Sequence, residues 1–273
     1  MPVGEHPTYS NPPCIERVLG VQFDPIPQLT AGLIGQFWST LDQEAWPVSR
    51  DADYLQPQVE EFGESIPNLN ALRFHFSQRV NIRVQIQSQQ NDRLIQIQND
   101  RFHFNWKRTR NGDEYPRYDS LRMKFIEQWN SFLQFLNDHK IEPPILNQWE
   151  VTYLNHIPQG TVWDSPQDWG FFRSLNPLPP EEDLLHLESF GGEWHFVIPE
   201  HRGRLHVKWS HTYSSEKKQL IVLNLTARGA VASTGTESLM DGLDLGRQQI
   251  VDSFQRLMSS TANQYWELEN GNS

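Results

Sequence analysis

Basic and amide side chains alternate with apolar ones between Ile82 and Arg108, where the sequence reads IRVQIQSQQNDRLIQIQNDRFHFNWKR. A period of two is typical of half-buried strands, so the polar residues should share one face of a sheet. None of them is a carboxylate, whereas solvated faces usually mix both signs of charge. Arginine can bind phosphate or carboxylate through paired hydrogen bonds. We therefore predict a polar, basic binding face, with a plain solvated face as the alternative. Its members are Arg73, His75, Arg83, Gln85, Gln96, Gln98, Arg101, His103 and Lys107, echoed later by Arg204, His206, Lys208 and Arg228.

Other residues that could do chemistry do not form a recognisable catalytic set. The cluster His195, His201, His206 and His211 suits alternate strand positions and a turn, and no carboxylate or cysteine accompanies it as in tight metal sites. Cys14 is the single cysteine, has no local histidine, and is expected to be a small semi-buried residue. Phosphate-binding glycine loops, nucleophile elbows and zinc-protease motifs are missing. We predict no metal, no cofactor and no catalytic residues, and we favour a protein that is not an enzyme.

Charge and composition narrow the class of protein. The chain has 273 residues, is 37% hydrophobic and carries a formal net charge of −11, which argues against a protein that grips nucleic acid with its whole surface. Positive charge is concentrated between residues 71 and 110. No apolar run approaches the roughly 18 residues needed to span a bilayer, and the first residues do not resemble a secretion signal. We expect a cytoplasmic protein with no membrane partner.

Apolar spacing indicates the elements that would position the binding face. Helical periodicity predicts helices over residues 28–41 and 120–138, the second capped by Asp119. Asp241, Asp244 and Arg247 fit the start of a last helix. Strands are expected at 16–23 and 72–76, and three short strands within 82–108; the acidic stretch 46–67 is expected to be a long ordered loop. The stripe Phe102, Phe104 and Trp106 is expected in the core, with a base-stacking platform as the alternative.

Segments of the first half of the sequence are similar to segments of the second half. Residues 11–27 read NPPCIERVLGVQFDPIP and residues 142–158 read EPPILNQWEVTYLNHIP. Three more blocks follow in the same order: Ile82 and Val84 with Leu205 and Val207; Leu94, Ile95 and Ile97 with Leu220, Ile221 and Leu223; Phe125, Ile126, Trp129 and Phe132 with Ile250, Val251, Phe254 and Leu257. We interpret this as an internal duplication. The predicted fold class is α+β, with two tandem pseudo-symmetric halves, 1–141 and 142–273, each an antiparallel sheet packed against a long C-terminal helix. One continuous sheet and two separate sheets both fit the pattern.

Several of these residues carry a resemblance to a known family. They are Pro12-Pro13, Glu16, Val21 to Phe23, Leu94 to Gln98, Asp100 to Phe102, Asn105-Trp106, Arg247, Ile250-Val251, Phe254 and Trp266. The chain resembles, over nearly its whole length, a sporadically distributed bacterial protein family of unknown function. That family has no established activity to transfer. Its patchy distribution is typical of genes that move with mobile or defence islands, and this association suggests an accessory factor in such a gene cluster.

Three functions fit the sequence. The first is a non-catalytic interaction protein that binds a protein partner through the exposed sheet face or the groove between the two halves, since Trp, Tyr and Arg suit an interface. The second is a nucleic-acid binder that uses the basic sheet face and loses affinity steeply with salt. The third is an enzyme assembled from distant residues, which would need a deep pocket with titratable groups of perturbed pKa. The sequence gives no indication of oligomeric state.

Overall fold

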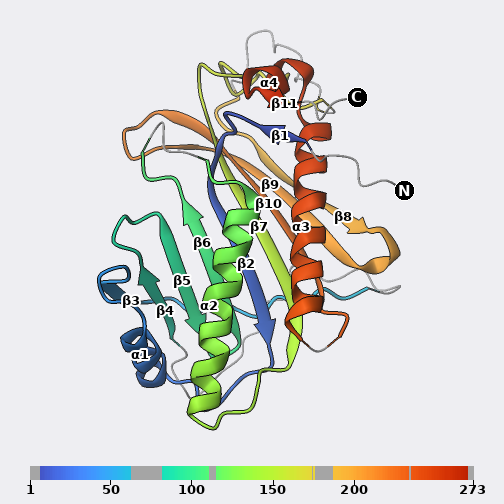
Figure 1. Cartoon of the computed structure of the whole chain (residues 1–273). Coiled ribbons are helices and arrows are strands. Elements are labelled where there is room, and N and C mark those ends of the chain that lie inside the picture. Colours follow the sequence, from blue (N-terminus) through green and yellow to red (C-terminus); the bar gives the residue numbers. More distant parts are fainter. Residues whose placement is uncertain are drawn as a thin grey trace.

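The fold is known from a computed structural model, which describes residues 7–62, 82–110, 115–173, 175, 187–233 and 235–269. These residues form a mixed α+β structure built on one nine-stranded antiparallel sheet with the strand order β3-β4-β5-β6-β2-β7-β10-β9-β8 (Figure 1). The strands are β1 (Thr8–Tyr9), β2 (Cys14–Phe23), β3 (Val48–Ala52), β4 (Arg83–Gln87), β5 (Arg93–Gln98), β6 (Arg101–Lys107), β7 (Leu146–Pro158), β8 (Gly191–Ile198), β9 (Gly203–Tyr213), β10 (Gln219–Ala230) and β11 (Leu268–Glu269). The helices are α1 (Ala31–Thr40), α2 (Tyr118–Asp138), α3 (Thr236–Leu257) and α4 (Ser260–Tyr265), with a 3-10 turn at Pro199–His201.

Strands β2 and β7 join the first and second parts of the chain into a single sheet. They pair antiparallel, with Leu19 opposite Val151 and Val21 opposite Trp149. Strand β6 returns to pair with β2, and β10 returns to pair with β7. Of the two arrangements that the sequence allows, the structure therefore has the continuous sheet. A separate two-stranded ladder, β1 with β11, lies beyond one end of it.

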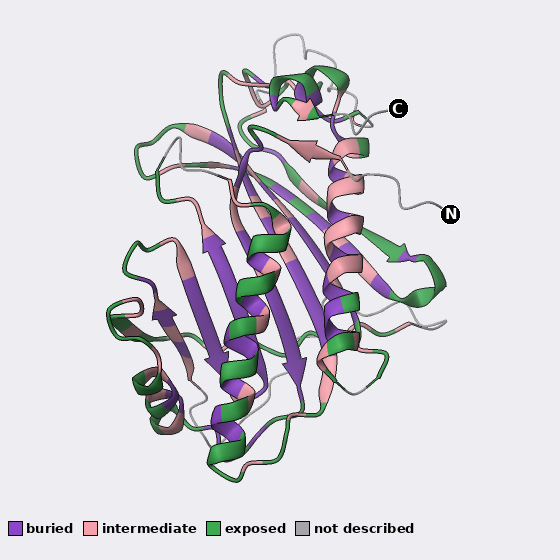
Figure 2. Cartoon of the chain, viewed as in Figure 1, coloured by how far each residue is buried: buried purple, intermediate pink, exposed green. Residues whose placement is uncertain are grey.

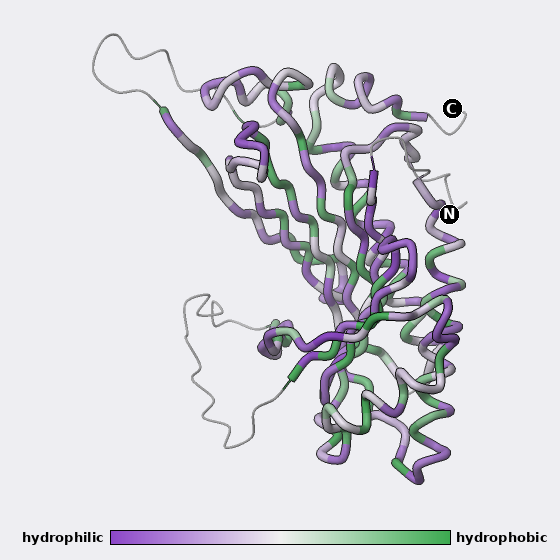
Figure 3. The backbone as a smooth tube through the Cα atoms, turned by 90° about the vertical axis from the view of Figure 1, so that its left-hand side faces the viewer, coloured by the Kyte–Doolittle hydropathy of each residue, from purple (hydrophilic) through white to green (hydrophobic). Residues whose placement is uncertain are grey.

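The long helices α2 and α3 lie on the same face of the sheet (Figures 1 and 3). Phe102 of β6 is fully buried there and packs against the rings of Phe125, Trp129 and Phe132 of α2, with centroids 5.3–6.1 Å apart. The faces of both helices that meet the sheet are buried, whereas the opposite face is largely exposed in α2 and largely half-buried in α3 (Figure 2). The predicted core stripe Phe102, Phe104 and Trp106 is therefore confirmed.

Helix α3 approaches the sheet closely because glycine removes side chains from the contact. A Cβ atom at Gly242 would lie 2.2 Å from Cδ1 of Trp149, and one at Gly246 would lie 2.7 Å from Cζ3 of the same ring. The two glycines are one helical turn apart, so they form a slot for the indole of Trp149 on β7. Any larger residue there would push α3 off the sheet.

Several predicted elements are found with shifted limits, and others are wrong. The three central strands β4, β5 and β6 are confirmed, and α2 begins at Tyr118 with Arg117 as its N-cap rather than Asp119. Residues 46–67 were expected to form only a loop, but they include β3. Helix α3 begins at Thr236, so Asp244 and Arg247 lie in its interior and not at its start. The predicted strand 72–76 lies outside the described residues.

The predicted repeat does not follow the sheet in all of its blocks. Val84 lies on β4, the third strand from β2, whereas its predicted counterpart Val207 lies on β9, the second strand from β7. Likewise Ile95 lies on β5, the second strand from β2, whereas Ile221 lies on β10, next to β7. In these two blocks, the predicted counterparts therefore occupy positions in the sheet that differ by one strand. The pseudo-symmetry of the two halves is therefore not confirmed by strand position.

Candidate functional site

The described residues of the predicted basic face do share one side of the sheet, opposite α2 and α3, but that side is not open. Gln96, Gln98, Arg101 and His103 are buried. The half-buried members are Arg83, Gln85, Lys107, Arg204, His206 and Arg228, and Lys208 is exposed. Arg73 and His75 lie outside the described residues. The expected exposure is therefore wrong for the central members of the face.

A segment of the same chain covers this side of the sheet. Residues 53–62, which we call the strap, run across this side of the sheet, behind the strands in Figure 1. Gln98 accepts a hydrogen bond from the backbone N–H of Leu55 at 3.2 Å and donates to its carbonyl at 2.9 Å. Gln22 and Gln148 both donate to the carbonyl of Gln58, at 3.1 and 2.6 Å. A glutamine amide matches a peptide group in its donors and acceptors, so glutamines on three strands hold an irregular segment in place.

The far end of the strap is held by charge. Glu60 accepts a hydrogen bond from Nε2 of His206 at 2.6 Å, pairs with Arg204, and lies 3.6 Å from Nη1 of Arg228. Burial alone would raise the pKa of the Glu60 carboxyl, but His206 and the two guanidinium groups outweigh burial and lower it. The ring of Phe62 lies against Arg204, 4.8 Å from its guanidinium carbon. Arg204, His206 and Arg228 of β9 and β10 are thus paired with carboxylates within the chain.

A second carboxylate lies in the centre of the same face. Glu150 of β7 accepts from Nε of Arg228 at 2.6 Å. Burial would raise its pKa, but Arg228, His103 and Arg101 lower it to about 2. Burial lowers the pKa of His103 to about 3 although Glu150 lies 3.8 Å away, so this imidazole is neutral. The expectation of a carboxylate-free face is wrong because Glu150 comes from a strand 47 residues along the chain from His103.

The predicted histidine cluster also gains a carboxylate from the strap. His195 and His206 face each other across β8 and β9, with 2.8 Å between their Nδ1 atoms, and Glu60 contacts His206. His211 instead bonds the amide oxygen of Gln219 at 3.0 Å. Among the described residues, no group of three or more His, Cys, Asp or Glu side chains could hold a metal ion.

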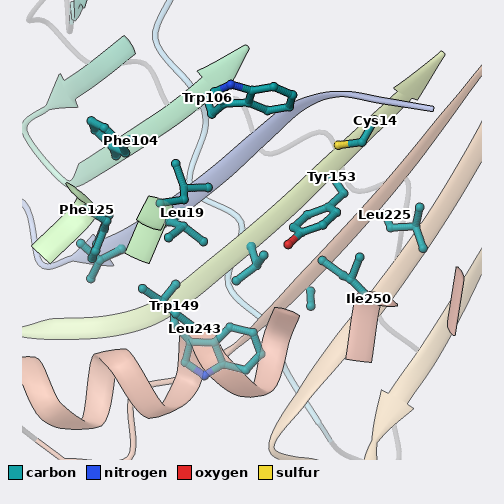
Figure 4. Close-up of a cluster of buried hydrophobic side chains, with 14 of the residues drawn as sticks. Cys14, Leu19, Phe104, Trp106, Phe125, Trp149, Tyr153, Leu225, Leu243 and Ile250 are labelled. Carbon is teal, nitrogen blue, oxygen red and sulfur yellow. The ribbon is translucent and has the colours of Figure 1, made fainter. Parts of the chain in front are cut away.

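A cavity of about 830 Å³ lies on the opposite face of the sheet, beside the N-terminus of α2 and the second half of α3. Its floor comes from β2, β7 and β10, its walls from the N-terminus of α2 and from α3, and its roof from the β1–β11 ladder. Figure 4 shows four of the apolar or weakly polar lining residues, Cys14, Tyr153, Leu225 and Ile250, each from a different element. The lining joins both parts of the chain, so the cavity lies between the two predicted halves.

Arg17 is the most unusual residue of the floor. It is only 1% exposed, and its guanidinium carbon lies 4.3 Å from the ring centroid of Tyr115 and 5.1 Å from that of Trp106. One Nη atom donates to the carbonyl of Pro116. The Nε–H group, in contrast, has no hydrogen-bond partner among the described residues. Buried donors are almost always paired, so an orphan on a permanently charged group needs an explanation.

Arg108 and Arg247 also line the cavity. Their Nε atoms, like that of Arg17, are buried and have no hydrogen-bond partner in the described part of the chain. Arg247 lies over the ring of Tyr118, with 5.6 Å between the guanidinium carbon and the ring centroid. Arg117 adds a fourth positive charge. The described lining contains two carboxylates, Asp119 and Glu269, so the cavity is electropositive.

The phenols and the thiol around the cavity are held neutral. Burial raises the pKa of Tyr115 well above its ordinary value, and burial together with Asp244 raises the pKa of Tyr118. Burial raises the pKa of the Cys14 thiol to about 11, although Arg17 opposes this effect. The phenols can therefore donate hydrogen bonds, and the thiol is not a ready nucleophile because thiolates carry that chemistry.

The N-terminus of α2 adds further donors to the wall. Arg117, Tyr118 and Asp119 all line the cavity, and Arg117 makes no side-chain capping bond. The first N–H groups of a helix have no partner within it and carry the positive end of the helix dipole. Anions bind readily at such ends.

Sequence reasoning missed this site, although one signal was present. Arg17 occupies the apolar phase of β2, in register with Leu19, Val21 and Phe23, which are all buried. An arginine in that phase must enter the core. Arg108 and Arg247 gave no comparable signal, because only the fold brings them together.

Comparisons with protein-family models, with curated proteins and with solved structures find no match for this chain. The resemblance to a bacterial family therefore stays a prediction, and the assignment of the site depends on its geometry.

Proposed function

We propose that this protein is a non-catalytic binding protein whose site is the cavity between α2 and α3, and that its ligand carries an anionic group. The observation that carries this proposal is the set of four arginines in the cavity lining, Arg17, Arg108, Arg117 and Arg247, which only two carboxylates of the described lining oppose. Charges held out of water cost free energy unless an opposite charge accompanies them. An anion in the cavity would supply that charge.

The position of the cavity agrees with one of the two surfaces expected from the sequence, the groove between the halves. Helix α2 belongs to residues 1–141 and α3 to residues 142–273, and both contribute to the walls. The volume of about 830 Å³ is in the range of small-molecule sites, roughly 300–1,000 Å³. This size favours a small molecule, or a single anionic side chain or chain end of a protein partner, over an extended polymer.

The two other functions have less support. The sheet face that would bind nucleic acid is occupied by the strap, through Gln98, Gln148 and Glu60. The cavity does contain groups of perturbed pKa, but burial raises the pKa of Tyr115, Tyr118 and Cys14, so these groups stay protonated and are poor bases or nucleophiles. No helix of the described residues is long and apolar enough to cross a membrane.

The proposal can be tested by thermal unfolding in a panel of anions: chloride, acetate, sulfate, phosphate and citrate. A multivalent anion should raise the Tm of the wild type but not that of Arg17→Met. The matched control is Arg93→Met, because Arg93 is half-buried on the sheet and already paired with Asp92 at 2.6 Å. The control should respond like the wild type. An equal rise in all three proteins, or none in the wild type, would contradict the proposal.

We also propose that the two halves are a repeat with a corrected alignment, in which β2, β6 and α2 correspond to β7, β10 and α3. In each half the last of these strands pairs with the first, and the long helix follows it on the same face. Superposition of these two units in an experimental structure tests the idea. A misfit of either helix by more than one turn would contradict it.

A further inference from the structure

We infer that the anionic group bound in the cavity is a phosphate monoester, held against the N-terminus of α2. The inference rests on the function proposed above and specifies its ligand. Helix α2 has 21 residues, and its N-cap, Arg117, makes no side-chain capping bond. Its first turn therefore presents free N–H groups to a cavity that Arg117, Tyr118 and Asp119 line. Phosphate is the group that such helix ends bind most typically.

Arg17 gives an independent reason to place the anion at this point. Its guanidinium is fixed by donation to the carbonyl of Pro116, the residue directly before the N-cap of α2. The positive charge of this guanidinium therefore lies beside the start of the helix. It acts together with the positive end of the helix dipole on an anion bound there.

The number and origin of the donors favour a tetrahedral dianion over a planar carboxylate. A carboxylate is satisfied by one arginine in a paired, planar geometry. Here Arg17 of β2, Arg108 from the chain just after β6 and Arg247 of α3 all line the same cavity. Donors from three elements suit an oxygen cluster that accepts from several directions. A charge of about −2 also matches four arginines opposed by two carboxylates.

The opposing carboxylates differ in how they are held. Glu269 accepts hydrogen bonds from the hydroxyls of Thr8 and Ser10, which tie it into the roof. Asp119 is exposed in the first turn of α2 and would lie nearest to the bound group. Removing the charge of Asp119 should therefore strengthen phosphate binding, whereas removing Arg247 should weaken it.

The cavity is also larger than a phosphate ion requires. The ring of Tyr9 packs edge-on against Phe254 with centroids 5.3 Å apart, and Ile250 lies one turn before it on α3. This wall is apolar and aromatic, and it faces the same space of about 830 Å³. The ligand is therefore an organic phosphate rather than the free ion.

Isothermal titration calorimetry on the full chain tests this inference with two probes that share a ring, phenyl phosphate and benzoate. At pH 7.5 phenyl phosphate should bind at least about tenfold more tightly than benzoate, which is about 1.4 kcal/mol. Arg247→Met should weaken phenyl phosphate binding by a similar factor, and Asp119→Asn should strengthen it a few-fold. Lowering the pH to 5.5, below the second phosphate pKa of about 6, should weaken phenyl phosphate but not benzoate.

The possible outcomes distinguish the phosphate assignment from the existence of the anion site. Equal binding of benzoate and phenyl phosphate, with both lost in Arg17→Met, would overturn the phosphate assignment and leave the anion site standing. If phenyl phosphate does not bind but another anion raises the Tm in an Arg17-dependent way, the phosphate assignment is likewise overturned and the anion site stands. No binding of either probe and no protection by any anion would overturn both. Asp119→Asn can be interpreted even if a variant of a buried residue fails to fold, because Asp119 is exposed and its substitution should not disturb the fold.

Discussion

The two faces of the central sheet bury charge in opposite ways. On the strap side, Glu150 and Glu60 lie within hydrogen-bonding or ion-pairing reach of Arg204, Arg228 and His206. On the helix side, Arg17 is buried as deeply as any of these residues, but it has no carboxylate partner in the described structure and instead contacts the carbonyl of Pro116 and the ring of Tyr115. Unpaired Nε atoms occur on both faces, at Arg17 and at Arg101, so the difference between the faces lies in the carboxylate partners of the buried arginines.

This difference shows that burial alone does not identify a functional arginine. A buried charge that the fold has paired is part of the structure, and removing one partner should mainly destabilise the protein. A buried charge that the fold has left partly unpaired is available to a ligand, and removing it should mainly affect binding. The following predictions test this separation, in order of decreasing effect on stability.

Glu60→Gln should have the largest effect. It would leave Arg204, Arg228 and His206 without their shared carboxylate, and breaking a buried pair typically costs about 3–5 kcal/mol. Urea unfolding of the wild type and the variant measures this loss. Its neighbour Glu61 is exposed, so Glu61→Gln is the control and should stay within about 0.5 kcal/mol. Equal losses for both variants would mean that the strap is not held by charge.

Acid should destabilise the strap side first. The unfolded chain binds a proton at His103 below its ordinary pKa of 6.5, whereas the folded chain does so only near pH 3, so stability is lost as pH falls through this window. Glu150 adds a second loss as pH falls from its ordinary pKa of 4.5 toward about 2. Burial keeps the pKa of His103 low, and the charges of Arg101, Arg83 and Arg228 add to this effect while Glu150 opposes it.

Urea unfolding at pH 7.5, 5.5 and 4.0 measures this dependence. His103→Asn cannot take up the proton, so the variant should lose less stability than the wild type between pH 6.5 and 4.5. An identical pH dependence in both proteins would show that His103 is not a buried neutral imidazole.

Gln148→Leu should cost less, about 1–3 kcal/mol, because it removes no charge. The carbonyl of Gln58 would lose its 2.6 Å donor and the N–H of Glu60 its 3.0 Å acceptor. Hydrogen exchange should show the strap opening more often in this variant. The exposed Gln36 on α1 provides the control Gln36→Leu, for which no change in strap protection is expected.

Arg17→Met should change stability least, within about 1 kcal/mol in either direction, because an apolar side chain of similar length replaces a buried charge. The same variant should lose the Tm increase that anions give to the wild type. A loss as large as that of Glu60→Gln would show that Arg17 is a structural residue, and the contrast between the two faces would fail.

Local pattern explains which parts of the fold could be predicted. Alternation within residues 82–108 is enough to identify β4, β5 and β6, and the stripe from Phe102 to Trp106 is enough to identify the side that meets α2. The strap could not be predicted because residues 53–62 have no period, and their position depends on amides of distant strands. The pairing of β7 beside β2, which brings Glu150 to His103, is equally non-local.

The candidate site could be predicted only in its first residue. Arg17 breaks the apolar phase of β2, and this exception is visible in the sequence. The convergence of Arg108 and Arg247 on the same cavity depends on the packing of α3 over β7 and on the ladder of β1 with β11. Such contacts join residues more than ninety positions apart, such as Gly242 and Trp149, and no local spacing encodes them.

The most direct measurement is the NMR signal of the Arg17 Nε–H group during a titration with phenyl phosphate, assigned by its loss in Arg17→Met. The account predicts a saturable shift of this signal, with the Nε–H of Arg93 unchanged because Asp92 already pairs with that side chain. An Arg17 signal that stays in place while the probe reaches millimolar concentration would contradict the claim that this buried, unpartnered guanidinium is an anion site.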